Sequence, residues 1–95
     1  MLFHVVITVR VPHDVRPEVL EDLGEREHRR AAELQRQGKW LHLWRVAGKW
    51  ANVSVFDVDS PAELHEILES LPLYPFMDVE VTALSPHPGA IPVTR

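Results

Sequence analysis

The stretch from Trp40 to Val58 most constrains the fold of this chain, because its pattern predicts two strands joined by a tight turn. Aromatic and β-branched residues occupy both halves of the stretch, and Ala47-Gly48-Lys49 between them has the composition of a turn. We predict strands over residues 40–47 and 50–58. Because an isolated hairpin is marginally stable in water, other parts of the chain must cover one of its faces.

The segments that flank the hairpin carry strand and helix patterns in turn. Residues 2–11 place apolar side chains at every second position, which predicts a strand. Residues 17–37 are rich in helix-forming residues and begin with a proline, which favours the first turn of a helix. Residues 60–63 form a capping box that opens a second helix, and residues 77–84 alternate as a last strand.

The resulting order is β-α-β-β-α-β, which is typical of the ferredoxin-like α+β fold. We therefore expect one domain over residues 1–95, with a four-stranded antiparallel sheet and two helices on one face. The other face would stay uncovered and carry residues such as Trp40, Trp44 and Trp50. We therefore expect it to pair with the sheet of a second copy, as in an α/β-barrel-type dimer. The proline-rich tail 85–95, which contains Ile91 and Val93, is expected to pack on a neighbouring subunit.

Strand alternation assigns the hairpin side chains to two faces of the predicted sheet. The face toward the helices is expected to carry Leu41, Leu43, Arg45, Val53 and Val55. The face left for assembly is expected to carry Trp40, His42, Trp44, Asn52 and Ser54. Asn52 and Ser54 lie two residues apart on one face, so their side chains could converge on a ligand; hydrogen bonding within the sheet is the commoner explanation.

Composition excludes several classes of function. The net charge is −4, from 14 acidic residues against 10 Lys and Arg, and no basic patch runs along the chain, which argues against nucleic acid as a partner. The absence of cysteine excludes disulfide and thiolate chemistry. The apolar run at residues 2–11 is too short and too interrupted for a membrane span or a signal peptide, so we expect a cytoplasmic protein.

The histidines and the known short motifs point to no metal or nucleotide site. The 6 histidines show no HxH, HxxxH or HExxH spacing, so we expect no metal. The chain also lacks a GxSxG elbow, a glycine-rich phosphate loop and a Rossmann fingerprint. Nucleophilic catalysis and nucleotide binding therefore have no support in the sequence.

Glu27 is the sharpest anomaly in the first predicted helix. It occupies the middle of an apolar stripe formed by Leu20, Leu23, Ala31 and Leu34. A carboxylate in such surroundings has a raised pKa, which suits it to act as a base. The alternative is a slightly rotated helix that places Glu27 at the rim, paired with Arg26 or Arg30.

Two further positions next to these elements attract attention. Gly24 lies one turn before Glu27 on the same side of the helix, where a glycine costs about 1 kcal/mol relative to alanine, so it could serve to leave space. Arg45 lies in a strand otherwise suited to burial. It could hold a carboxylate through a bidentate pair, or form an edge salt bridge with Asp57 or Glu80.

Several blocks of the sequence together resemble the muconolactone Δ-isomerase family. The blocks are MLFHVVITVRVP, LQRQGKWLHLWRVAG, ANVSVFDV, LPLYPFMDVEV and the pair His87-Pro88. The resemblance extends over nearly the whole chain. It implies a ferredoxin-like protomer, paired through its sheet and assembled into a homodecamer, that needs no metal or organic cofactor. It also implies conversion of a small-molecule lactone, muconolactone, to 3-oxoadipate enol-lactone in bacterial catechol breakdown through the β-ketoadipate pathway.

The resemblance and the reaction chemistry assign roles to particular residues. Glu27 matches the glutamate that the family is thought to use for proton transfer. Arg45 is our candidate for binding the substrate carboxylate. Candidates for lining the site and for oxyanion donation are His4, Asn52 and Ser54, and Trp44 and Tyr74 would supply apolar walls.

The chain departs from the family pattern at two positions, and two other functions stay open. Gly24 stands where the family often has a lysine, and Trp50 stands where a smaller aromatic residue is expected. The first alternative is a chloromuconolactone dehalogenase of the same fold. The second is a non-enzymatic dimeric binding module, which predicts that no open pocket lies beside Glu27.

Overall fold

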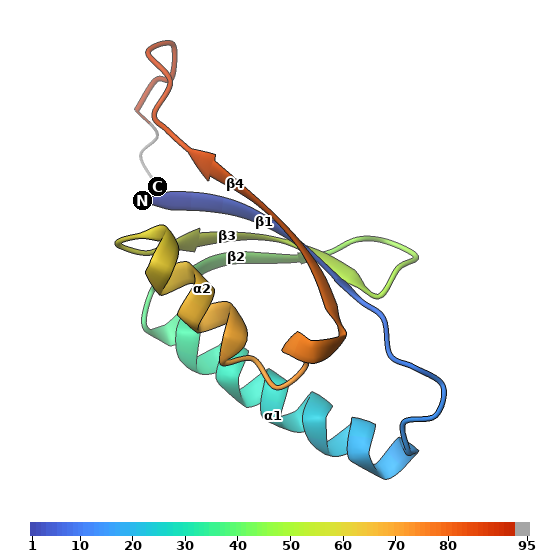
Figure 1. The fold of residues 1–95 in the computed structure, drawn as a ribbon. Coiled ribbons are helices and arrows are strands. Elements are labelled where there is room, and N and C mark those ends of the chain that lie inside the picture. The colour runs from blue at the N-terminus through green and yellow to red at the C-terminus, as the bar shows by residue number, and fades with distance from the viewer. Residues whose placement is uncertain (93–95) are drawn as a thin grey trace.

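The computed structural model describes residues 1–92 and has the predicted order of elements (Figure 1). The elements are β1 (Leu2–Val9), α1 (Pro17–Arg36), β2 (Trp40–Arg45), β3 (Ala51–Asp57), α2 (Pro61–Glu69), the 3₁₀ helix η1 (Tyr74–Phe76) and β4 (Met77–Leu84). All strand pairs are antiparallel, and the strand order is β2-β3-β1-β4. Both helices lie on one side of this sheet, which confirms the predicted ferredoxin-like fold (Figure 1).

The helix ends follow the local signals in the sequence. Pro17 occupies the first turn of α1, and Gly38 follows the helix with a φ of 75° that favours glycine. At α2 the Ser60 hydroxyl accepts the Glu63 N–H at 3.1 Å, while the Glu63 carboxylate accepts the Asp59 N–H at 2.7 Å. These bonds satisfy N–H groups that a helix start otherwise leaves without partners.

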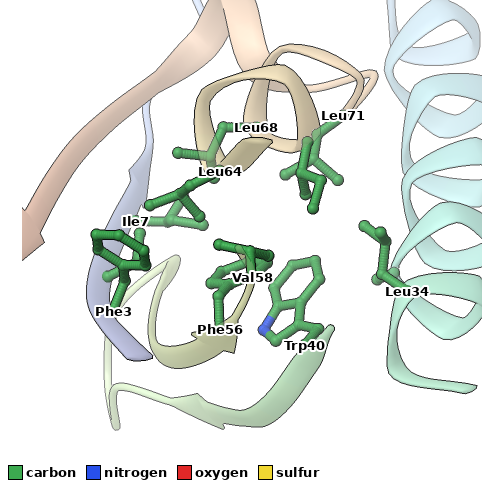
Figure 2. Packing of buried hydrophobic residues seen from close by; sticks show 12 residues of the cluster. Phe3, Ile7, Leu34, Trp40, Phe56, Val58, Leu64, Leu68 and Leu71 are labelled. Atoms are coloured by element: carbon green, nitrogen blue, oxygen red, sulfur yellow. The ribbon is translucent and has the colours of Figure 1, made fainter. Parts of the chain in front are cut away.

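The core lies between the sheet and the two helices (Figure 2). Its buried residues are Phe3, Val5 and Ile7 from β1, Ala31 and Leu34 from α1, Trp40 from β2, Phe56 from β3, Leu64, Ile67 and Leu68 from α2, and, outside these elements, Val58 and Leu71. Trp40 stacks on Phe56 with ring centroids 4.7 Å apart. Burial of these apolar surfaces, at about 25 cal/mol per Å², is the main force that holds the helices on the sheet.

The prediction that Trp40 lies on the assembly face was wrong. Trp40 is only 3% exposed and packs in the core, whereas Trp44 is 55% exposed on the opposite face. The register explains the difference, because Trp40 pairs with Phe56 and His42 pairs with Val55, so Leu41 is an extra residue in β2. This bulge reverses the alternation between Trp40 and Trp44, which an unbroken strand would place on one face.

The predicted faces of β3 were also wrong. Ser54 pairs across the sheet with Val5 and Leu43, and Asn52 pairs with Ile7 and Arg45, so both polar residues lie on the helix side of the sheet. Phe56 shares their face and is in the core. Val53 and Val55 therefore face the other side. The prediction failed because β-branched residues do not mark the covered face of β3; the covered face carries the polar pair of Asn52 and Ser54 beside the core residue Phe56.

The uncovered face of the sheet, which we call the outer face, carries an aromatic pair on β2. His42 and Trp44 stack with ring centroids 4.8 Å apart and an interplanar angle of 6°. Beyond β4, residues 85–92 extend past the end of the sheet (Figure 1). Residues 93–95, including Val93, lie outside the described part, and docking of the 85–95 tail on a neighbouring subunit stays a prediction.

Candidate active site

A pocket of about 460 Å³ lies where α1 faces the hairpin strands. Three of the predicted site residues line it, namely Glu27 from α1, Arg45 from β2 and Asn52 from β3. Apolar side chains such as Val9, Leu43 and Met77 form much of the remaining wall. The pocket is thus mainly apolar with a few convergent polar groups, which is the usual composition of a small-molecule site.

Glu27 is partly buried and receives one backbone hydrogen bond. The Leu73 N–H donates to Glu27 Oε1 at 2.9 Å. Burial raises the pKa of Glu27 above its ordinary value of 4.5, and the Leu73 N–H opposes this shift less strongly. A carboxyl group with a raised pKa is a stronger base once it is ionised, so this carboxylate is suited to accept a proton from carbon.

The alternative in which Glu27 pairs with an arginine at the rim was wrong. Arg26 pairs with Asp22 at 3.2 Å, and Arg30 pairs with Glu33 at 2.7 Å. Within residues 1–92, Glu27 makes no ion pair. Its carboxylate therefore faces the pocket without a fixed countercharge on its own helix.

The connection from α2 to η1 brings the Leu73 N–H to Glu27. Leu73 is buried, and Pro72 and Pro75 flank it closely. The Tyr74 N–H donates to the Leu71 carbonyl and the Phe76 N–H donates to the Leu73 carbonyl, both at 2.9 Å. Sequence reasoning missed this contact, because the group that Leu73 contributes belongs to the backbone; the nearby prolines are the only local sign of a fixed conformation.

Arg45 ends β2 beside the pocket with its side chain exposed. Its Nη1 donates to the Lys49 carbonyl at 3.2 Å, which holds the guanidinium near the turn. Asp57, one of the two predicted salt-bridge partners, contacts the N-terminal amine at 3.3 Å instead. Arg45 makes no ion pair with any residue between 1 and 92, so its charge is available to an anionic ligand.

Asn52 and Ser54 form one hydrogen-bonded unit on β3. The Ser54 hydroxyl donates to Asn52 Oδ1 at 2.7 Å, and Ser54 is 0% exposed. Of the two, only Asn52 lines the pocket. The pair therefore bonds within the sheet, which is the commoner of the two explanations, and a role of Asn52 in ligand binding stays a prediction.

The structure does not bring the other predicted site residues to this pocket. His4 is on the outer face of β1, opposite Val55 and Thr82. Trp44 is on the same outer face of β2, and Tyr74 packs partly buried against the core from η1. In one protomer these three residues lie away from the pocket that contains Glu27.

Gly24, His28 and Trp50 line the pocket although the sequence did not assign them to it. A Cβ atom built at Gly24 would meet nothing within 4 Å, so the glycine leaves open space one helical turn from Glu27. Trp50, expected at the assembly face, is instead a pocket residue that stays 47% exposed. The hydrophobic pattern alone does not distinguish an aromatic residue at the assembly face from one in the pocket when that residue follows a turn.

Two kinds of feature are absent from the described part of the chain. Across residues 1–92, no three side chains of His, Cys, Asp or Glu come together in a way that could hold a metal ion. In the same range, neither helix combines the length and the apolar character needed to cross a membrane.

Comparisons with known proteins agree along the whole chain. A sequence model of the family described as "Muconolactone delta-isomerase" matches residues 1–90. Muconolactone Delta-isomerase 2 of Acinetobacter lwoffii is 53% identical over 91 residues, which cover 96% of this chain and 95% of that protein. Muconolactone Delta-isomerase of Pseudomonas aeruginosa is 50% identical with the same coverage. A crystal structure of muconolactone isomerase superposes with a TM-score of 0.92 at 50% identity, covering 99% of this chain and 98% of that one.

Proposed function

The chain belongs to the muconolactone delta-isomerase family, and we propose that it converts muconolactone to 3-oxoadipate enol-lactone with Glu27 as the proton-transfer group. The observation that carries this proposal is the partly buried Glu27 carboxylate, with its raised pKa, at an open and mainly apolar pocket. The same pocket argues against a purely structural binding module, which predicts no cavity beside Glu27.

The reaction moves a ring double bond by a proton shift between two carbons that are two positions apart. The first proton is acidic because its removal gives a dienolate conjugated through the lactone carbonyl. Return of a proton to the second carbon completes the isomerisation with no change in composition. The site must therefore supply a base, a donor for the developing oxyanion, and a cation for the carboxymethyl group of the substrate.

Glu27 is suited to both proton steps. In its ionised form it takes the proton from the first carbon, and as the resulting carboxylic acid it delivers a proton to the second carbon. One carboxylate can serve both positions if they share a face of the ring. The Leu73 N–H fixes one oxygen of the carboxylate, so that Oε2 is the oxygen left for the substrate.

The remaining pocket groups match the two ends of the substrate. Arg45 would bind the carboxymethyl carboxylate, because its guanidinium lies beside the pocket and keeps further N–H donors for a bidentate pair besides the one that bonds to the Lys49 carbonyl. Asn52, opposite Arg45 in the β2–β3 register, would donate to the lactone oxygen as negative charge develops there. Exclusion of water by the apolar wall would strengthen both interactions.

The outer face would serve assembly. The exposed Trp44, stacked on His42, gives this face an apolar patch that pairing with a second sheet would cover. His4 would belong to the same contact, and Tyr74 would support the pocket from behind through the core. Dimers of this kind, arranged into a homodecamer in the cytoplasm, complete the proposal that the resemblance implies.

The first experiment is an ultraviolet assay of the purified protein with muconolactone. We expect turnover by the wild type and a loss of 10²–10⁴-fold in kcat for Glu27→Gln, which is the range that general-base catalysis contributes. The glutamine can still accept the Leu73 N–H, so the substitution removes the base and keeps the contact. Glu25→Gln, an exposed change on the same helix, is the matched control and should leave kcat unchanged.

Two results would overturn the proposal at different levels. No turnover of muconolactone by the wild type would remove the isomerase function. A loss of less than about tenfold in Glu27→Gln would remove Glu27 as the base. Chloride release from a chlorinated muconolactone, measured in parallel, would identify a dehalogenase if it exceeded turnover of the plain lactone.

A further inference from the structure

We propose that Ser54 is a positioning residue that fixes the orientation of the Asn52 amide, so that the Asn52 NH₂ group is presented to the pocket. This inference rests on the proposed function and deepens it, because it gives the two β3 residues different tasks. Asn52 lines the pocket, whereas Ser54 is 0% exposed and reaches the substrate only through Asn52. The hydrogen bond of 2.7 Å between Ser54 Oγ and Asn52 Oδ1 links them.

The surroundings of Ser54 make this bond obligatory. On the neighbouring strands Ser54 lies opposite Val5 and Leu43, which offer only apolar side chains. Among residues 1–92, the one side-chain acceptor that the Ser54 hydroxyl reaches is Asn52 Oδ1. A buried hydroxyl hydrogen without an acceptor is destabilising, because it loses the hydrogen bond that water provides in the unfolded chain.

The two orientations of the Asn52 amide therefore differ in free energy. With Oδ1 toward Ser54, the hydroxyl donates its hydrogen and the amide keeps both of its N–H donors for the pocket. With the amide reversed, the NH₂ group would donate to Ser54 Oγ and the hydroxyl hydrogen would be stranded. The first orientation is the stable one, and it turns a group that can be donor or acceptor into a defined donor.

A defined donor is what the proposed reaction needs on this wall. The lactone oxygen gains negative charge in the dienolate, and an amide oxygen at the same place would repel it. Asn52 pairs with Arg45 in the β2–β3 register, so the two residues present N–H donors side by side. Ser54 thus acts on the rate of the chemical step through the direction of its neighbour's amide.

A double-mutant cycle of Asn52→Ala and Ser54→Ala tests the proposal. Asn52→Ala is expected to lower kcat about 10²-fold, in the range found for loss of one oxyanion donor. Ser54→Ala is expected to lower kcat about tenfold while KM changes less than about twofold, because the freed amide can then turn Oδ1 toward the N–H donors of the neighbouring Arg45, and the reversed orientation predominates. The double variant is expected to match Asn52→Ala within about twofold, since Ser54 acts only through Asn52.

Two further variants separate positioning from a structural role. Ser54→Thr keeps the hydroxyl and is expected to recover kcat toward the wild-type value, with thermal unfolding checking that the added methyl is accommodated. Ser70→Ala also removes a hydrogen-bonded hydroxyl, but one that bonds to Arg30 and the Ile67 carbonyl away from the pocket. This control should leave kcat and KM unchanged.

A nuclear magnetic resonance measurement reads the orientation without catalysis. The Ser54 hydroxyl proton is expected to exchange slowly and to show a contact with Asn52 that disappears in Asn52→Ala. Additive losses in the double variant, or full kcat in a folded Ser54→Ala, would overturn the proposal. An inactive wild type would instead overturn the isomerase function. In that case the Ser54 hydroxyl resonance would still show whether Ser54 donates to Asn52. Absence of this hydrogen bond would also overturn the proposal.

Discussion

Among single side chains, Glu27 carries the largest conflict between folding and catalysis. Burial disfavours its ionised form, which is the form that the proposed base needs. The group is retained at the pocket with one backbone donor and with no arginine from its own helix. Titratable groups with perturbed pKa values are concentrated at functional sites. The same conflict gives Glu27 two measurable dependences on pH.

The activity should fall on the acidic side at a pH above 4.5, the ordinary pKa of glutamate. The base must be ionised to take a proton, and its pKa in the folded protein is raised, so protonation begins to inhibit it earlier as the pH decreases. We expect the acidic limb of the kcat/KM profile to follow this raised pKa. A profile that is flat down to pH 4.5 would contradict the role of burial at Glu27.

The stability of the fold should show the matching effect. Because the folded-state pKa of Glu27 is raised above the unfolded value, the folded state binds the proton more tightly. The contribution of this group is fully present below the unfolded pKa and is lost as pH rises through the folded pKa. The melting temperature of Glu27→Gln relative to that of the wild type should therefore increase as the pH rises from acidic to neutral. Glu25→Gln should show no such increase.

Arg45 should influence substrate binding more than the chemical step. Loss of a charge-assisted hydrogen bond typically costs about 1.5–3 kcal/mol, which corresponds to roughly a 10–100-fold rise in KM. We expect Arg45→Ala to raise KM in this range with a smaller change in kcat. Arg36→Ala, at an exposed position in the last turn of α1, is the control. A change confined to kcat would assign Arg45 to the chemical step instead.

Among the elements, α1 combines a structural and a functional demand at Gly24. The helix continues through this residue without a positive φ, so alanine would fit its backbone. The glycine nevertheless lowers helix stability and leaves open space at the pocket. At Gly24, α1 is therefore locally less stable than it would be with alanine, and the pocket is larger.

Gly24→Ala should stabilise the protein by about 1 kcal/mol and make the pocket smaller. The measurement is chemical denaturation together with KM for muconolactone. Gly38→Ala is the informative comparison, because Gly38 has a φ of 75° and the same change there should destabilise the protein. Destabilisation by Gly24→Ala would mean that the helix tolerates no side chain at that position.

For the whole molecule, the outer face is the main surface without a covering layer. Two helices cover one side of the four-stranded sheet (Figure 1). The stacked pair of His42 and Trp44 lies on the other side. A domain of 95 residues buries only about two thirds of its unfolded surface, so association through this face would add stability.

Trp44→Glu should shift the protein to a smaller species in light scattering coupled to gel filtration. A charge placed in an apolar contact is disfavoured by desolvation and has no partner there. Ala62→Glu introduces the same charge on an exposed position of α2 and should leave the molar mass unchanged. An unchanged mass in Trp44→Glu would show that the outer face does not hold the assembly together.

Local patterns were sufficient for the elements, their order and the anomaly at Glu27. Periodicity and caps depend on residues a few positions apart, so the predicted bounds of α1 and β4 and the predicted start of α2 lie within a residue or two of the observed ones. The unusual position of Glu27 in the stripe followed from the same spacing. The placement of Arg45 on the helix side was also correct, because its part of β2 follows the bulge without further irregularity.

Packing between distant elements settled the rest. The extra residue Leu41 changes the alternation of β2, and it becomes visible only when Trp40 and His42 are paired with their partners on β3. The Leu73 N–H reaches Glu27 from 46 positions away, and no side-chain pattern encodes a backbone donor. Ser54 and Asn52 lie on the helix side because they share a face of β3 with Phe56. Burial of the Phe56 ring stabilises the fold by more than hydration of two small polar side chains on the outer face would.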